Sequence, residues 1–260
     1  MKRILLIDGD IVAFAAASAV ETAIEWEPGE FSSYASLEDA QAAVETTLAK
    51  YVDDLKADEI KIALTDSPGN FRKKVLPTYK ANRAGQRKPL ILSQVRKWMI
   101  DTLQATLIPT LEGDDVLGVW STHPGLKGEK IVVSIDKDMQ SIPGLIYCPG
   151  KDTEPREITE AQADRFHFIQ TLSGDAVDGY AGCPGTGAVK AARLVDDPEL
   201  ARDPVKTWEA ILACYKKAGL GPEEALRQAQ VARICRASDY NSKQKKVILW
   251  KPTLSKPKAQ

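Results

Sequence analysis

Residues 3–10 read RILLIDGD, a run of aliphatic residues that ends in two aspartates around a glycine. Four successive large aliphatic side chains predict a short strand that is buried on both faces, as in a parallel sheet. Two later stretches repeat this arrangement: Ile60–Leu64 is followed by Asp66, and Lys130–Ile135 is followed by Asp136. Ligands bind at the carboxyl ends of parallel strands. The pattern therefore predicts a ligand site where these aspartates meet.

Helical patterns surround the predicted strands. Apolar residues recur on one face of residues 37–56, and Leu90–Leu107 also looks helical. Strands that alternate with helices predict the α/β class with a parallel sheet.

The second part of the chain has a different pattern. Beyond about residue 158 the sequence predicts helices, interrupted by the Gly/Pro-rich stretch Gly179–Gly187, and a final short strand at Val247–Trp250. We expect an α/β core over residues 1–160 and a helical second part over residues 161–260.

The composition is that of an ordinary globular protein. The net charge of −1 does not by itself indicate a polyanionic partner. Four dispersed cysteines and only two histidines disfavour a zinc site and suggest free thiols in a reducing compartment. Lys2, Arg3 and the apolar run that follows resemble a signal peptide, but Asp8 and Asp10 interrupt the run. We expect a soluble protein of the cytoplasm with no membrane partner.

Nine acidic residues are the candidate metal ligands. They are Asp8, Asp66, Glu112, Asp114, Asp115, Asp136, Asp138, Asp175 and Asp178. Glu112 and Asp115 are three residues apart and would share one face of a helix. Asp175 and Asp178 repeat that spacing. Asp136 and Asp138 would point the same way from an extended strand end.

So many gathered carboxylates would repel one another and would stay ionised only around cations. Oxygen ligands suit Mg²⁺ or Mn²⁺ better than zinc, and two such ions about 4 Å apart can activate water and stabilise the leaving oxygen in phosphodiester cleavage. Taken singly, Asp-Gly-Asp or Gly-Asp-Asp is common at turns and helix caps. Their joint occurrence at predicted strand ends is harder to explain in that way.

A basic stretch without acids follows the second predicted strand. Between Ser67 and Ile100 there is no acidic residue, and the basic residues are Arg72, Lys73, Lys74, Lys80, Arg83, Arg87, Lys88, Arg96 and Lys97. Two aromatic residues, Phe71 and Tyr79, lie among them. A solvated helix face normally mixes both charge signs, so this stretch favours a surface that binds the phosphates of a nucleic acid.

Three glycines precede a predicted helix. Gly182, Gly185 and Gly187 lead into a segment with Lys190 and Arg193, where exposed N–H groups and basic side chains would suit a phosphate backbone. A Gly/Pro turn between two helices is the common alternative. The position just after Asp175 and Asp178 favours the phosphate site.

Six motifs occur in an order that resembles the 5′-nuclease (flap endonuclease) superfamily, and most closely the 5′-3′ exonucleases of podovirus-type bacteriophages. They are Asp8-Gly9-Asp10, Thr65-Asp66-Ser67, Tyr79-Lys80-Ala81-Asn82-Arg83, Glu112-Gly113-Asp114-Asp115, Asp136-Lys137-Asp138, and Gly174-Asp175 through Asp178 to Gly187. The tail, with Val231-Ala232-Arg233-Ile234 and Leu249-Trp250-Lys251-Pro252, is similar too, so the resemblance spans nearly the whole chain.

The resemblance implies a PIN-like α/β nuclease core, a helical arch over the active site within residues 71–98, and a helix–three-turn–helix that grips duplex DNA. The nine acids listed above would be the metal carboxylates. Lys80 and Arg83 would lie at the base of the arch, where Lys80 would neutralise the scissile phosphate. The residues implied in DNA binding are Arg72, Tyr79, which would stack on the terminal base, Asn82, Gly182, Gly185, Gly187 and Lys190. In this superfamily the glycine turn often also holds a monovalent cation such as K⁺.

Two positions depart from the family pattern. Asp10 stands where many cellular relatives have a non-acidic residue, which puts its role as a ligand in question. The segment available for the arch is short and contains Pro89, which argues against threading of long 5′ flaps.

The resulting expectation is a 5′-3′ exodeoxyribonuclease that uses Mg²⁺ or Mn²⁺, in two sites, on double-stranded DNA with 5′ ends. The resemblance also implies roles in phage DNA replication and host DNA degradation, and hydrolysis of RNA in RNA–DNA hybrids. Three alternatives are a structure-specific flap endonuclease, a non-catalytic DNA-binding module, and a PIN-type ribonuclease toxin. The complete set of motif acids disfavours the second, and the glycine turn disfavours the third.

Overall fold

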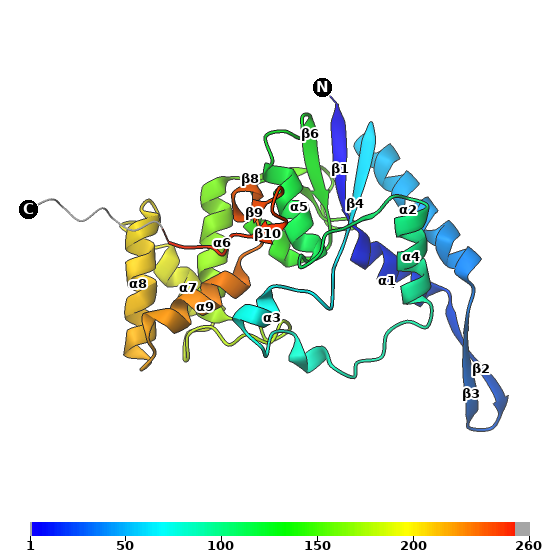
Figure 1. Cartoon of the computed structure of the whole chain (residues 1–260), viewed down its shortest axis with the longest axis horizontal. Coiled ribbons are helices and arrows are strands. Elements are labelled where there is room, and N and C mark those ends of the chain that lie inside the picture. Colours follow the sequence, from blue (N-terminus) through cyan, green and yellow to red (C-terminus); the bar gives the residue numbers. More distant parts are fainter. Residues whose placement is uncertain (1, 253–260) are drawn as a thin grey trace, which may run out of the picture.

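The computed structural model describes residues 2–252, and its centre is a six-stranded sheet of order β5-β4-β1-β6-β7-β8 (Figure 1). The strands are β1 (Arg3–Asp8), β4 (Glu59–Leu64), β5 (Thr106–Leu107), β6 (Glu129–Val133), β7 (Gly144–Tyr147) and β8 (Arg156–Ile158). All neighbouring pairs are parallel except β7 and β8. The predicted parallel α/β sheet is confirmed.

The apolar run of β1 lies at the middle of this sheet and is buried on both faces. Leu5 and Ile7 pack on one face against α1 (Gly9–Ala19), α2 (Leu37–Leu55) and α4 (Leu92–Asp101). Ile4 and Leu6 pack on the other face against α5 (Gly113–Thr122) and the start of α6 (Glu160–Ser173). Alternate side chains of a strand point to opposite faces, so a strand between two helical layers needs apolar residues throughout.

The helical part surrounds a second apolar core. Its further helices are α7 (Ala188–Val195), α8 (Pro204–Lys217) and α9 (Pro222–Ala232). Trp250 closes this core edge-on against Trp208, with their ring centroids 5.3 Å apart. Between α9 and Trp250 the chain returns to the α/β core, where Ile234 and Cys235 lie in the same buried cluster as Leu6 of β1.

Two predicted elements are wrong in extent. The helix predicted at Leu90–Leu107 is only α4; Gln104 adopts a left-handed backbone with φ 56°, and the chain then adds the edge strand β5. The strand predicted at Val247–Trp250 is β10 (Lys246–Val247), which pairs with β9 (Tyr240–Asn241). Apolar periodicity continues through both regions and does not mark where the backbone changes direction.

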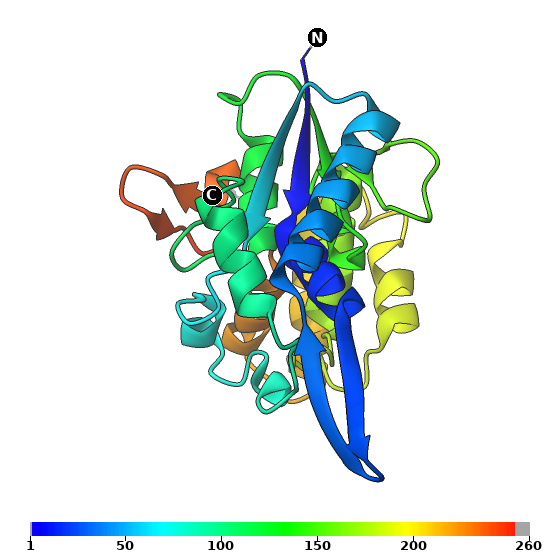
Figure 2. The same cartoon turned by 90° about the vertical axis from the view of Figure 1, so that its right-hand side faces the viewer.

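A β-hairpin that the sequence analysis missed projects from the body of the molecule (Figure 2). It consists of β2 (Glu21–Glu27) and β3 (Glu30–Ala35), joined at Pro28 and Gly29, where Gly29 has φ +87°. A Pro–Gly pair between two alternating segments is a turn signal that could have revealed it.

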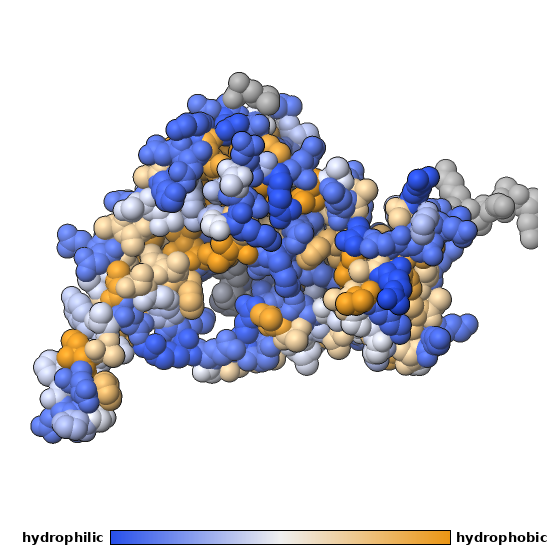
Figure 3. Space-filling model, turned by 180° about the vertical axis from the view of Figure 1, so that it is seen from behind, coloured by the Kyte–Doolittle hydropathy of each residue, from blue (hydrophilic) through white to orange (hydrophobic). Residues whose placement is uncertain are grey.

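The expected helical arch is only partly helical. It contains α3 (Arg72–Val75) and a 3₁₀ turn at Ala81–Arg83, and then runs without helix to α4. We call residues 76–91 the strap. Pro77, Gly85 and Pro89 explain the lack of a continuous helix, since each disfavours a helix interior. Figure 3 shows an opening between this segment and the body of the molecule.

Among residues 2–252, no helix combines the length and the apolar character needed to cross a bilayer.

Candidate active site

A cavity of about 690 Å³ lies between the strap and the carboxyl ends of β1, β4 and β6. Five of the predicted acids line it: Asp8, Glu112, Asp114, Asp136 and Asp178. Lys80, Arg83, Arg87 and Lys88 line it from the strap. The cavity therefore places a cluster of carboxylates opposite a basic cover.

Asp8 and Asp114 are held where their charges are unfavourable. Asp8 caps α1, accepts a hydrogen bond from the Ser134 hydroxyl at 2.7 Å, and is buried, which raises its pKa to about 6. Burial, and then the charge of Asp8, raise the pKa of Asp114 well above its usual value. A cation beside Asp8 and Asp114 would lower their raised pKa values, because it favours the ionised forms of both carboxylates.

Glu112 is held in its ionised form. Its two oxygens accept hydrogen bonds from Lys80 Nζ at 2.6 Å and from Arg72 Nη1 at 3.0 Å, and the Tyr79 hydroxyl lies 2.8 Å away. Burial alone would raise the pKa of Glu112, but the charges of Arg72 and Lys80 outweigh it and lower the pKa to about 2. A fully ionised carboxylate is thus fixed in one orientation at the cavity wall.

Lys80 reaches the cavity from a left-handed backbone position, with φ 54°. Its backbone N–H donates to the carbonyl oxygen of Asp178 at 2.8 Å, and its Nζ lies 3.4 Å from the carboxylate of Asp178. Burial lowers the pKa of Lys80, but Glu112 and Asp178 more than compensate, and the net shift is upward. Arg83 adds a 2.6 Å ion pair to Asp178, and Asn82 donates to the carbonyl oxygen of Ala176 at 2.9 Å. The base of the strap is therefore fastened to residues 175–178.

A second acidic group adjoins the first. Lys137 Nζ lies 2.9 Å from Asp138 and 2.7 Å from Asp175, and Gln170 donates to Asp138 at 2.8 Å. Asp138 lines a smaller cavity of about 20 Å³ together with Asp114 and other residues of the main cavity wall. The two acidic groups are neighbours that share Asp114.

Asp136 and Asp138 do not point the same way, contrary to the prediction. The chain leaves β6 at Val133, and Asp136 caps a 3₁₀ turn by accepting a hydrogen bond from the backbone N–H of Asp138 at 2.8 Å. This turn sends Asp136 to the main cavity and Asp138 to the smaller one.

The donor set fits hard divalent cations, because it consists of carboxylate oxygens without cysteine or histidine. Within the described part of the chain, no three such side chains lie close enough together to form a ready metal cluster. Lys80 and Lys137 lie between the acids and balance their charges. Metal binding at this site would therefore require these lysines to release their carboxylates.

Two predicted ligands do not face the cavity. Asp66 Oδ2 accepts a hydrogen bond from the backbone N–H of Thr110 at 2.7 Å, so Asp66 fastens a loop. Asp115 is fully buried and pairs with Arg72. The spacing of Glu112 and Asp115 proves to be a capping box at the start of α5, not a pair of ligands on one face.

Two residues expected to contact DNA are also buried. Arg72 is 2% exposed and Tyr79 is 3% exposed, so neither offers an exposed face for stacking on a base, although Tyr79 borders the main cavity. Both instead donate hydrogen bonds to Glu112. Asp10, the doubtful ligand, pairs with Arg96 and accepts a hydrogen bond from Thr65 N at 2.9 Å, which ties α1 to α4.

The glycine turn joins α6 to α7 beside the acidic groups. Gly174 and Gly182 both have φ +66°, and a methyl group on Gly182 would overlap the backbone nitrogen of Gly174. Gly187 caps α7 in open space, and Lys190 donates to the carbonyl oxygen of Gly185 at 3.1 Å. The turn thus presents a helix N-terminus and a lysine to solvent, as the phosphate interpretation requires.

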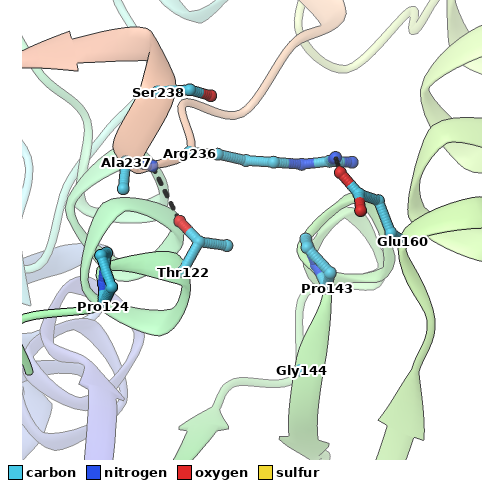
Figure 4. Close-up of a pocket in the computed structure, with 8 residues that line it drawn as sticks. All are labelled: Thr122, Pro124, Pro143, Gly144, Glu160, Arg236, Ala237 and Ser238. Carbon is cyan, nitrogen blue, oxygen red and sulfur yellow. Dashed lines mark hydrogen bonds and ion pairs between the residues drawn. The ribbon is translucent and has the colours of Figure 1, made fainter. Parts of the chain in front are cut away.

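A second hollow, of about 530 Å³, lies on another part of the surface (Figure 4). Prolines and small residues line most of it, and its one acid, Glu160, faces Arg236 at 3.6 Å. It has neither a carboxylate cluster nor a basic cover, so the cavity under the strap is the candidate active site.

The sequence analysis missed several supporting residues. Ser134 orients Asp8, Gln170 orients Asp138, and Lys137 bridges two acids. Only Lys137 carried a signal, since it lies between Asp136 and Asp138 in the sequence.

Comparison with known proteins gives a family match and full-length relatives. The family model described as 5′-3′ exonuclease, N-terminal resolvase-like domain, matches residues 3–154. The exodeoxyribonuclease of Enterobacteria phage T3 is 32% identical, over 96% of this chain and 93% of the relative. The exonuclease of Escherichia phage T7 is also 32% identical, over 96% of this chain and 94% of the relative.

Solved structures support the fold. The bacteriophage T5 5′-exonuclease with bound zinc ions superposes with a TM-score of 0.63 at 14% identity, over 89% of each chain. A complex of the bacteriophage T5 flap endonuclease with DNA and metal ions gives a TM-score of 0.60 at 14% identity, again over 89% of each chain.

Proposed function

The chain belongs to the 5′-3′ exonuclease family, and from that membership we propose that it removes nucleotides from the 5′ ends of duplex DNA with the help of Mg²⁺ or Mn²⁺. One observation carries the proposal: five of the expected metal carboxylates, together with Asp10, line a single cavity whose cover is a basic strap without acids. We further propose that it serves phage DNA replication and host DNA degradation in the bacterial cytoplasm, the roles that the resemblance to phage nucleases implies.

The carboxylates divide into two sets of proposed ligands. Asp8, Glu112, Asp114 and Asp136 would hold one cation in the main cavity, and Asp138 and Asp175 would hold a second with Asp114 or Asp178. When bound, the two ions supply an activated water and stabilise the leaving oxygen. Glu112 serves in this role without changing its protonation, because its pKa lies far below neutral.

Lys80 is proposed to stabilise the scissile phosphate. Its ammonium stays protonated, lies between Glu112 and Asp178, and lines the cavity. Metal binding would free this ammonium from Glu112 and Asp178, and a phosphodiester that enters the cavity would then meet its positive charge, which favours the more negative transition state. Arg83 supports this position by holding Asp178.

The duplex is proposed to lie along the glycine turn. Gly182 and Gly185 shape the turn, Gly187 exposes the start of α7, and Lys190 adds a charge, so the phosphate backbone can approach closely. The same turn is proposed to bind K⁺. We also propose RNA in RNA–DNA hybrids as a substrate, which the resemblance to phage nucleases implies.

The decisive experiment compares Asp136→Asn and Asp175→Asn with the wild type on a 5′-labelled duplex in Mg²⁺ and in EDTA. Both variants should lose cleavage by a factor of about a hundred or more while duplex affinity is largely kept. Asp54→Asn is the control, since Asp54 pairs with Lys50 on the surface of α2. Turnover near that of the wild type in both active-site variants would refute the metal assignment.

A flap endonuclease is the second candidate, because the strap and the body of the molecule border an opening beside the carboxylate cavity (Figure 3). Short products from blunt or recessed ends favour the exonuclease, whereas a single cut at the base of a 5′ flap favours the endonuclease.

A further inference from the structure

The middle of the strap is held by one element, the β2–β3 hairpin. Within the described chain, every hydrogen bond from residues 84–91 to another element ends on this hairpin. Arg87 pairs with Glu21 and lies 3.4 Å from the Ser33 hydroxyl, and the backbone N–H of Leu90 donates to Glu21 at 3.0 Å. All the remaining bonds of the segment are local turns.

Glu21 is the centre of this attachment. One carboxylate oxygen accepts from Arg87 and the other from Leu90, and the side chain is 12% exposed. The bond from Leu90, and then that from Arg87, lower the pKa of Glu21, so it stays ionised at neutral pH. One side chain thus holds two points of the strap, three residues apart.

Glu21 is also rigidly connected to the carboxylates. Helix α1 begins at Asp8 in the cavity and ends at Ala19, two residues before Glu21. Ile11 and Phe14, on the exposed side of this helix, line the same cavity as Arg87. The distance from Asp8 in the cavity to the strap is therefore set by helix α1 and by the ion pair between Glu21 and Arg87.

We propose that Glu21 is a positioning residue for the nuclease reaction: by holding Arg87 and Leu90 it fixes the strap over the carboxylates and determines which 5′ ends enter. This inference rests on the proposed function. Glu21 does not line the carboxylate cavity and is bonded to Arg87 and Leu90, so it acts through the strap. Loss of the attachment leaves residues 84–91 tethered only at their ends, at Arg83 and at α4. A loose strap orders only on binding DNA, and that ordering weakens affinity.

The test uses Glu21→Ala and Glu21→Gln, with Glu30→Gln as the matched control on the same hairpin. Two substrates are compared: a 5′-labelled duplex, and thymidine 5′-(4-nitrophenyl phosphate), which is too small to need the strap. For Glu21→Ala we expect the KM for the duplex to rise about tenfold, with kcat/KM for the small ester unchanged. Glu21→Gln should give a smaller rise, because an amide can still accept one of the two hydrogen bonds.

Limited trypsin digestion reports the strap directly. Cleavage between Arg83 and Ala84 should be about five to ten times faster in Glu21→Ala, with an unchanged Tm, because the freed segment fits a protease site more often. The double variant Glu21→Arg with Arg87→Glu should restore slow cleavage after Arg83.

The possible failures are distinguishable. The inference is overturned if both Glu21 variants have the digestion rate and the duplex KM of the wild type. It is also overturned if kcat/KM falls equally on the duplex and on the small ester. If the wild-type protein cleaves neither substrate, the proposed function fails, while the digestion rates still decide whether Glu21 holds the strap.

Discussion

The guanidinium of Arg72 lies against the carboxylate of Asp115 in a two-pronged ion pair, with Nη1 2.7 Å from Oδ2 and Nη2 2.8 Å from Oδ1. Neither side chain reaches solvent. The same guanidinium donates to the carbonyl oxygens of Val231 at 2.9 Å and Arg233 at 2.6 Å. Cys235 N donates to Oδ1 of Asp115, the oxygen that also accepts from Arg72 Nη2, at 3.0 Å. One buried charge pair therefore joins α3, α5 and the segment that follows α9.

Asp115→Ala should lower the free energy of unfolding by about 3–5 kcal/mol, because it leaves the Arg72 charge buried without its partner. Urea denaturation in EDTA measures this.

The neighbouring variant Asp114→Asn should lose cleavage without loss of stability, because burial disfavours the ionised form of Asp114 in the folded protein. A stable Asp115→Ala protein would contradict the structural role assigned here.

Lys80→Met should lower kcat on the duplex by about a hundredfold, because the scissile phosphate loses its fixed positive charge. Affinity for duplex DNA should change by less than about threefold, since we propose that the glycine turn supplies most of the phosphate contacts. Lys80→Arg, which keeps the charge, should retain part of the activity. Steady-state kinetics and a binding titration in Ca²⁺ separate the two quantities; a loss of affinity alone would contradict the prediction.

Gly182→Ala should destabilise the protein by more than about 2 kcal/mol, since a methyl group there meets the backbone of Gly174 and the residue has positive φ. Gly187→Ala is the control: its φ is −78° and its surroundings are open, so the Tm should hardly change. The Gly187 variant should instead weaken duplex binding by obstructing the approach to α7. Thermal unfolding and a DNA titration measure the two effects, and equal Tm losses would argue against the close backbone crossing.

His167 should make stability depend on pH. Burial, and then the charge of Arg233, lower its pKa to about 3, while its Nε2 donates to the carbonyl oxygen of Ala229 at 2.8 Å. A depressed folded-state pKa means that this contribution is present above the unfolded value of 6.5 and is lost as the pH falls towards 3. Between pH 7.5 and 5, the wild type should lose about 2 kcal/mol more than His167→Gln. Urea titrations at both pH values measure this.

His123→Gln is the control for that comparison, because the His123 ring is exposed. It should lose stability with pH as the wild type does. If His167→Gln also follows the wild type, the buried neutral histidine is not the cause.

Strands β1, β4 and β6 could be predicted from the sequence because they are rich in apolar residues that the sheet buries. Strands β5, β7 and β8 are shorter and partly exposed, and they were not predicted. The meeting of Asp8 and Asp136 followed from the parallel order of β1 and β6. The hairpin was missed because its alternation is short and most of its side chains are exposed. The family was recognisable because its motifs depend on residue order, which the sequence states directly.

The roles of individual acids were harder to predict. A spacing of three residues suits both a pair of ligands and a capping box, and only the position of Arg72 shows that Asp115 belongs to the latter. The residues of the basic stretch also differ in their environment, which their charge does not reveal. Arg72 is buried, whereas Lys80 and Arg87 line the cavity. The attachment at Glu21 joins residues 66 positions apart, and no local pattern encodes such a contact.

The buried pair of Arg72 and Asp115 also affects the order of events during synthesis. The family model matches residues 3–154, yet the backbone groups that complete this pair come from residues 231–235. Because Arg72 also holds Glu112, a nascent chain cannot complete the wall of the catalytic cavity until Cys235 has left the ribosome. The segment that the family model matches is thus shorter than the segment that must be translated, and a truncated product would lack an assembled nuclease site.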